Sequence, residues 1–138
     1  MTTVLGKKIV SKSLFFAAIY NIIYGAYLIL FPLHFFTVFE MDPPRYIEFW
    51  QCIGMIVGVY GVGYLIASTN PIHHYAIVLV GFMGKVFGPI GFVGALVKET
   101  LPLEFGVMII FNDLIWWPFF FYWLKKAFET YKEAAVNP

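Results

Sequence analysis

Apolar residues fill four long stretches of the chain, and short polar or proline-containing segments separate them. A helix needs about 20 mainly apolar residues to cross the hydrocarbon core of a bilayer. The stretches that meet this need are residues 14–31, 49–67, 75–97 and 103–124. The second and third connections are short, so the neighbouring helices should run antiparallel. The pattern predicts an all-α fold: a four-transmembrane-helix antiparallel bundle in one integral membrane domain over residues 1–138.

Composition supports a membrane environment. The chain of 138 residues is 61% hydrophobic and only 12% charged, whereas soluble domains are about one quarter charged. A soluble protein of this size has too much surface to hide so many apolar side chains. The lipid bilayer is therefore the expected partner, and a net charge of +1 gives no basic footprint for nucleic acid.

Lysine and arginine side chains are distributed unevenly between the two sides of the predicted spans. The side that holds both termini has Lys7, Lys8, Lys12, Lys125, Lys126 and Lys132. The opposite side has only Arg45 and Lys98. Because basic residues favour the cytoplasmic side, both termini are predicted to be cytoplasmic. Residues 125–138 are expected to continue the fourth helix as a cytoplasmic tail, with Phe128 and Tyr131 on one face.

The longest connection, residues 33–47, contains the apolar segment HFFTVFEM. This segment is typical of a short helix that lies in the membrane interface. An irregular loop that buries its phenylalanines explains the same residues equally well.

Glycines recur along the second and third spans at spacings of three and four, which places each set on one helical face. The members are Gly54, Gly58 and Gly61, then Gly81, Gly84, Gly88 and Gly91. Small residues let helix backbones approach closely in lipid. The sets are therefore predicted to be helix-packing seams inside the bundle. The alternative is a seam between two copies of the chain, as a homodimer, or within a larger membrane complex.

Lys85 is the main candidate for function because it is the eleventh residue of the third span, near the bilayer centre. An ammonium group there costs from about 3 to more than 10 kcal/mol unless it is paired or hydrated. Asn112 and Asp113 lie at similar depth in the next span. We expect Lys85 to face the bundle and to pair with Asp113, either as an ion pair or as a neutral hydrogen-bonded pair. The pair could be functional or could simply fix the helix register.

Further polar side chains are predicted to join this pocket: Asn21, Tyr24, Gln51 and Tyr60. Two prolines add backbone acceptors, because proline cannot donate to the carbonyl four residues earlier. Pro89 should free the carbonyl of Lys85, and Pro118 should free that of Leu114.

Metal, haem and nucleophile sites are not expected, so no cofactor and no catalytic residue are predicted. His34 lies on the opposite side of the predicted membrane from His73 and His74, so they cannot share a metal or haem. Cys52 is the only cysteine, which excludes a disulfide within the chain and a redox pair.

The four short spans, the uncharged second turn and the segment RYIEFWQCIGMIVGVYGVGYLIA before NPIHH resemble the DoxX-like superfamily of small bacterial membrane proteins. The resemblance implies a four-helix protein of the bacterial inner membrane, often an accessory of oxidoreductase or oxidative-stress systems. FNDLIWWPF also resembles a segment of small bacterial membrane proteins labelled alkyl hydroperoxide reductase. A thiol peroxidase mechanism would need a partner for Cys52, and no catalytic residue carries over.

These observations lead to three functional hypotheses. The first is a polar pocket around Lys85, Asn112 and Asp113 that binds a small amphiphile or relays protons, as an accessory of a larger membrane system. The second is a structural subunit that docks partner helices through its glycine seams. The third is an enzyme that acts on a lipid-soluble substrate.

Overall fold

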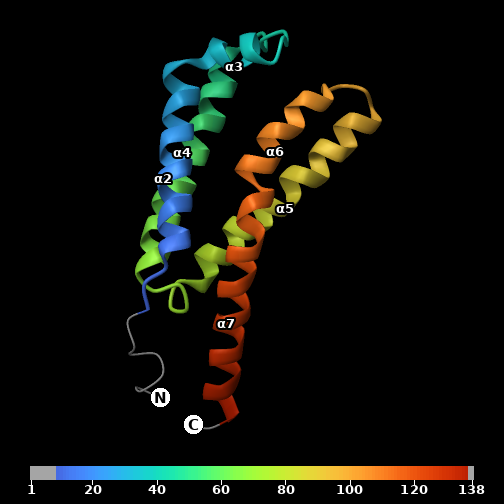
Figure 1. Ribbon diagram of the computed structural model, residues 1–138. Coiled ribbons are helices and arrows are strands. Elements are labelled where there is room, and N and C mark those ends of the chain that lie inside the picture. The colour runs from blue at the N-terminus through green and yellow to red at the C-terminus, as the bar shows by residue number, and fades with distance from the viewer. Residues whose placement is uncertain (1–8, 137–138) are drawn as a thin grey trace.

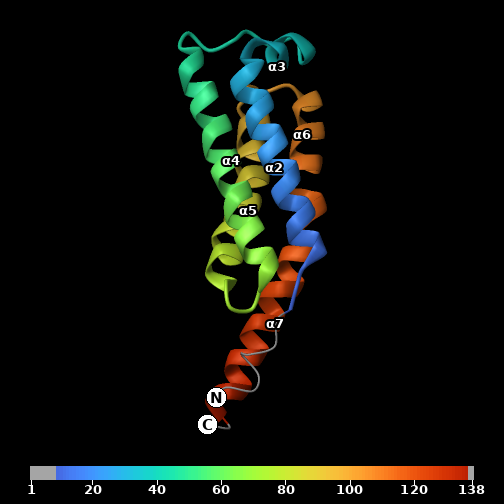
Figure 2. The same cartoon turned by 90° about the vertical axis from the view of Figure 1, so that its left-hand side faces the viewer.

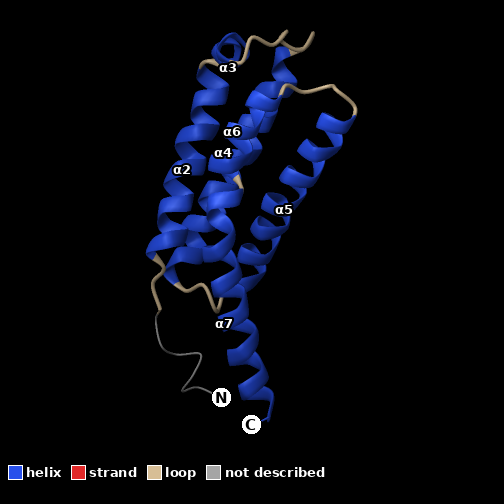
Figure 3. Cartoon of the chain, turned by 45° about the vertical axis from the view of Figure 1, so that its right-hand side comes forward, coloured by secondary structure: helices blue, strands red, loops and turns tan. Residues whose placement is uncertain are grey.

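A computed structural model describes residues 9–136, so Lys7 and Lys8 of the orientation argument lie outside the described residues. Within this range the regular elements are all helices (Figure 3). In chain order they are α2 (Lys12–Leu30), α3 (Pro32–Val38), α4 (Ile47–Thr69), α5 (Tyr75–Val97), η1 (Leu103–Phe105), α6 (Gly106–Asn112), η2 (Leu114–Trp116) and α7 (Trp117–Val136). Four segments are long and apolar enough to cross a membrane. The predicted all-α fold with four such segments is confirmed.

Helices α2 and α4 form an antiparallel hairpin whose backbones touch (Figure 1). A Cβ atom added to Gly25 would lie 2.5 Å from the carbonyl oxygen of Gly54 and 2.7 Å from the amide nitrogen of Gly58. Further along, a Cβ on Gly61 would lie 2.9 Å from the carbonyl oxygen of Ala18. Gly54 and Gly61 therefore pack against α2, whereas an added Cβ atom on Gly58 would meet nothing within 4 Å. The glycine spacing in α4 does not reveal their close partner on α2, Gly25.

The long connection between these two helices begins with the short helix α3. Proline is favoured at a first helical position because no N–H is needed there, and Pro32 occupies it. Phe35 and Phe36 are buried, with ring centroids 4.7 and 5.0 Å from that of Trp50. Phe35 also reaches Phe105 of η1, at 5.8 Å. The segment thus combines both expectations, a short helix and buried phenylalanines, and it links the hairpin to the fourth span.

At the end of the hairpin opposite to α3, the residue before α2 is hydrogen-bonded to the last turn of α4. The amide N–H of Ser11 donates to the carbonyl of Ser68 at 2.8 Å. The Ser11 hydroxyl caps α2 by accepting a hydrogen bond from the amide of Leu14 at 3.2 Å. The described chain ends lie toward this end of the bundle (Figure 2).

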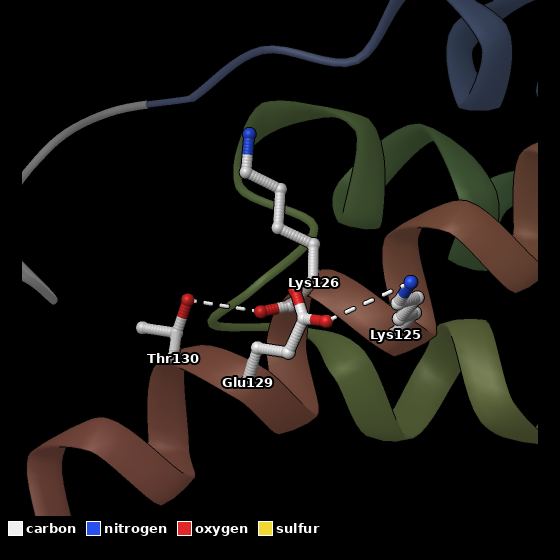
Figure 4. A network of polar contacts seen from close by, with 4 residues as sticks. All are labelled: Lys125, Lys126, Glu129 and Thr130. Atoms are coloured by element: carbon white, nitrogen blue, oxygen red, sulfur yellow. Dashed lines mark hydrogen bonds and ion pairs between the residues drawn. The ribbon is translucent and has the colours of Figure 1, made fainter.

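Helix α7 continues beyond the other helices, as expected for residues 125–138 up to Val136 (Figure 2). Its Phe128 and Tyr131 share a face and pack on Tyr75, with ring centroids 6.2 and 5.2 Å away. The polar side carries an ion pair of 3.8 Å between Lys125 and Glu129 (Figure 4). The predicted helical tail is therefore anchored by aromatic contacts at the start of α5.

The fourth span differs from the expected continuous helix, because it is interrupted between α6 and α7. Asp113 has φ −121° and ψ −63°, and a single 3₁₀ turn follows before α7 starts. Pro118 is the second residue of α7, a position where helices tolerate proline. The carbonyl of Leu114, expected to be free, accepts the amide N–H of Trp117. We call residues 113–116 the helix break.

Candidate functional site

The helix break lies beside Lys85, which is about halfway along α5 and only 3% exposed. The Lys85 Nζ atom donates to the carbonyl oxygen of Asn112 at 2.6 Å. In a continuous helix this carbonyl would accept the amide of Trp116, which instead donates to Asp113 at 3.1 Å. The lysine therefore caps the last residue of α6, where the helix dipole is negative.

Three aromatic rings complete the surroundings of the ammonium group. Lys85 Nζ lies 5.7 Å from the ring centroid of Tyr64, 5.9 Å from that of Trp116 and 5.8 Å from that of Phe120. Aromatic faces attract cations, most strongly where water is excluded. The carbonyl and the rings together can hold a positive charge away from water.

The direct Lys85–Asp113 ion pair expected from the sequence is not made in this structure. Within residues 9–136, the only ion pair is the one between Lys125 and Glu129. The Asp113 carboxylate instead accepts the side-chain amide of Asn112 at 2.9 Å. Its Oδ2 atom lies against Gly88, where an added Cβ would be 2.5 Å away. The difference arises because the break exposes a carbonyl one residue before Asp113, and the ammonium binds that.

Two tryptophan indoles satisfy other backbone acceptors near the break. Trp117 Nε1 donates to the carbonyl of Lys85 at 2.9 Å, so the acceptor freed by Pro89 is occupied rather than open to a ligand. Trp116 Nε1 donates to the carbonyl of Phe111 at 3.0 Å. Backbone groups at this depth must be satisfied internally. The hydropathy pattern does not identify these two donors, although the adjacent Pro118 marks the place where such donors are needed.

A cavity of about 200 Å³ lies next to the break. It is lined by Asn21, Ile56, Val57, Tyr60, Tyr64, Gly81, Gly84, Lys85, Asn112 and Asp113. These residues come from α2, α4, α5 and the fourth span, so the cavity is shared by all four membrane-crossing segments. Ile56 is 53% exposed, which places one edge of the cavity at the outer surface of the bundle.

Two residues that line this cavity carry a buried amide oxygen without a hydrogen-bond donor. Asn21 Nδ2 donates to the carbonyl of Val57 at 3.4 Å, and Asn112 Nδ2 donates to Asp113. The Oδ1 atoms of Asn21 and Asn112 are both buried and have no hydrogen-bond partner among the described residues. An unsatisfied buried acceptor costs about 1–3 kcal/mol, so these two oxygens make the surroundings of the break less stable than a fully hydrogen-bonded site.

Five of the predicted pocket residues line the cavity: Lys85, Asp113, Asn112, Asn21 and Tyr60. Two others lie elsewhere. Gln51 donates to the carbonyl of Ile29 at 2.9 Å, and Tyr24 stacks between Tyr20 and Tyr27. Tyr64 was missed, although its position four residues after Tyr60 places both on one face of α4.

The glycines of α5 do not form a uniform packing seam. A Cβ on Gly81 would overlap the ring of Tyr64, and Gly88 leaves room for the Asp113 carboxylate. Added Cβ atoms on Gly84 and Gly91 would meet nothing within 4 Å. Gly84 lines the cavity, so at this position the missing side chain leaves open space instead of a helix contact.

Metal ligands do not gather within residues 9–136, where no group of three or more His, Cys, Asp or Glu side chains could hold an ion. His34 contacts the Tyr27 hydroxyl at 2.7 Å, while His73 and His74 lie in the turn at the other end of the bundle. Cys52 is exposed on the surface of α4.

No family model, no curated protein and no solved structure matches this chain. The function of the site must therefore come from its own chemistry. Halfway along α5, the ammonium of Lys85 and the carboxyl group of Asp113 belong to residues that line an open space, and Asn21 and Asn112 beside them each have a buried amide oxygen without a donor. Such a site can bind a polar group within the hydrocarbon layer.

Proposed function

We propose that this protein is a small multi-pass membrane protein whose cavity beside the helix break binds a small amphiphile. The single observation that supports the proposal most is the cavity of about 200 Å³ around Lys85, Asn112 and Asp113. Ionisable residues within membrane spans commonly mark ligand or ion pathways. Interrupted helices at this depth are tolerated where they line a cavity or are buried in protein.

Proton relay is supported less well by the same residues. A relay between Lys85 and Asp113 needs a direct or water-mediated path between their charged groups. The ammonium is instead directed at the carbonyl of Asn112 and at three rings. Binding of a ligand in the cavity needs no such path between the two charges.

The proposed setting is a bacterial inner membrane with both termini in the cytoplasm, where the protein serves as an accessory of a redox or stress system. The lysine distribution supports the orientation, and the resemblance to DoxX-like proteins supports the setting. An impermeant thiol reagent can test the orientation in a Cys52→Ser background. In intact cells it should label Pro43→Cys and spare Ala135→Cys, and the reverse pattern would exclude this orientation.

A structural subunit is the second candidate. It is supported by the close engagement of Lys85 with one carbonyl and three rings, since such contacts would also fix helix register. In that case the open space beside Gly84 would have no ligand.

The two α5 glycines without neighbours provide a matched test. Both glycines are exposed, but only Gly84 lines the cavity. Gly84→Leu should fill the cavity without a backbone clash, whereas Gly91→Leu adds the same side chain to the same helix away from the cavity. Each variant and the native protein would be extracted in lipid discs, and copurifying small molecules would be identified by mass spectrometry. We expect the native protein and Gly91→Leu to retain an amphiphile that Gly84→Leu loses, with similar melting temperatures.

Identical small molecules in all three samples would exclude the cavity as the binding site. Loss of a copurifying protein from Gly91→Leu alone, with no small molecule in any sample, would favour the structural subunit.

A further inference from the structure

The part of α5 that follows Pro89 and the whole of α6 are weakly packed. The buried residues of α5 are Val78, Gly81 and Lys85, which all precede the proline, and neither η1 nor α6 contains a buried residue. In Figures 1 and 3 the second half of α5 diverges from the α2–α4 hairpin. Segments with few buried apolar contacts open at a low free energy. Residues 90–112, which we call the distal segment, therefore have little packing to hold them against the hairpin.

The distal segment is joined to the rest of the chain by a backbone interruption at each end. At one end, Pro89 cannot donate to the carbonyl of Lys85, which accepts the Trp117 indole instead. The other end is the helix break. The two interruptions lie side by side, since an added Cβ atom on Gly88 would be 2.5 Å from Asp113 Oδ2. Helices change direction at such places, so the two interruptions can act as one hinge.

Phe105 of η1 connects the distal segment to α3. Its ring centroid lies 5.8 Å from that of Phe35 in α3 and 6.0 Å from that of Phe39, directly after α3. It also lies 5.9 Å from the ring centroid of Phe92 in α5. Aromatic pairs at these separations attract one another. Phe105 thus holds the second half of α5 near α3, at a place in the segment away from the hinge.

The position of the distal segment determines one wall of the cavity. Asn112 is the last residue of the segment, lines the cavity and offers its carbonyl to the Lys85 ammonium. The α5 residues that line the cavity are Gly81, Gly84 and Lys85, and all of them precede the hinge. A rotation about the hinge therefore moves the wall at Asn112 and leaves the α5 wall in place.

We propose that the distal segment is a gate that swings about Pro89 and the helix break, and that Phe105 is the latch that holds it against α3. Opening of the gate admits a membrane amphiphile to the cavity past Asn112. This proposal rests on the proposed function of the cavity and adds the way in which a ligand reaches it.

Distances between spin labels test the movement in lipid discs, with Cys52→Ser in every variant. The first pair, Ile53→Cys with Val93→Cys, joins α4 to the distal segment. The second pair, Val62→Cys with Val80→Cys, joins the same two helices on the other side of the hinge. All four positions are exposed and can carry a label. We expect a broader distance distribution for the first pair than for the second.

Phe105→Ala tests the latch. Loss of its three ring contacts should raise the ratio of longer to shorter distances in the first pair by at least about tenfold. Phe111→Ala removes an exposed ring of the same segment and should leave both pairs unchanged. The second pair also shows whether each variant is folded. Pro89→Ala restores an amide N–H inside α5 and should narrow the distribution of the first pair.

Access to the cavity is a separate measurement. Val57→Cys places a thiol at a residue that lines the cavity. N-ethylmaleimide should modify this thiol several-fold faster when Phe105→Ala is added, because the wall at Asn112 then moves away more often. Addition of Phe111→Ala should leave the rate unchanged.

A first pair that stays as narrow as the second in both the native protein and Phe105→Ala would overturn the gate. Equal changes from Phe105→Ala and Phe111→Ala would exclude Phe105 as the latch. Movement of the segment without faster modification of Val57→Cys would show that it does not control the cavity. The proposed function fails separately, through the Gly84→Leu comparison, which detects bound molecules and not movement.

Discussion

The α2–α4 hairpin and the α5–α7 half of the molecule use the same small residue for opposite purposes. In the hairpin, Gly25 and Gly54 remove side chains so that two backbones touch. In the other half, Gly81 and Gly88 remove side chains so that a tyrosine ring and a carboxylate fit. Glycine spacing alone therefore does not predict helix contact, because what occupies the vacated space decides the result.

The polar groups follow the same division. The hairpin contributes Asn21, two tyrosines and two aliphatic side chains to the cavity, whereas the other half contributes Lys85, Asn112 and Asp113. Close backbone packing leaves no room between α2 and α4, while the interruption of the fourth span leaves a backbone carbonyl for Lys85 and an open space beside it. The hairpin is thus the tightly packed half of the molecule, and the charged groups of the site come from the other half.

The largest effect is expected from the polar half. Lys85→Met removes the charged donor to the Asn112 carbonyl and a positive charge from the cavity that Asp113 also lines, which should lower the free energy of unfolding by about 3 kcal/mol. Denaturant unfolding in mixed micelles would measure it. Lys98→Met, an exposed lysine at the end of the same helix, is the control and should change little.

Adding Asp113→Leu to Lys85→Met should restore part of this stability, because the buried carboxyl is gone but the Asn112 carbonyl still lacks its donor. Equal stability of Lys85→Met and Lys98→Met would show that the ammonium contributes nothing to folding and would remove the contrast between the two halves.

The hairpin should respond to a single methyl group. Gly25→Ala places a Cβ atom 2.5 Å from a backbone oxygen and should cost about 1–3 kcal/mol as an overpacked contact. Gly58→Ala, on the facing helix, meets nothing within 4 Å and should be neutral or slightly stabilising, since alanine favours helix over glycine. Thermal unfolding in detergent would compare them. The same response from both would mean that the backbones do not touch at Gly25.

A smaller effect concerns the acceptor freed by Pro89. Trp117→Phe removes the indole that donates to the Lys85 carbonyl and should cost about 1–3 kcal/mol. In a Pro89→Ala background the new amide N–H can donate to the same carbonyl, so Trp117→Phe should cost at least about 1 kcal/mol less there. A double-mutant cycle by unfolding measures this coupling. Additive effects would exclude the indole as the substitute donor.

Sequence predicted the helices well and the backbone inside them poorly. The first span was placed at residues 14–31 and is Lys12–Leu30, because average hydropathy determines where a helix can cross lipid. Average hydropathy does not predict the break at Asp113, because it contains no information on local backbone geometry. Pro118 predicts a free carbonyl at Leu114, but in the structure it instead marks the first turn of a new helix.

The position of each polar residue along its span predicts its depth in the membrane, but it does not predict the direction in which the side chain points around the helix. Depth was sufficient for Lys85 and Asp113, which line one cavity, and insufficient for Tyr24 and Gln51, which face other neighbours. The partner of the ammonium is a backbone carbonyl, and every residue has one, so no side-chain pattern could identify it.

The separation of Lys85 from its acceptor has a consequence for the order in which the protein is made. The two partners are 27 residues apart in the chain, and at about 5–20 residues per second the intervening chain takes about 1–5 s to synthesise. The α2–α4 hairpin is complete before that interval begins, while Lys85 must wait for the fourth span before its ammonium is capped. Formation of the polar half therefore depends on a segment that is synthesised after the α2–α4 hairpin.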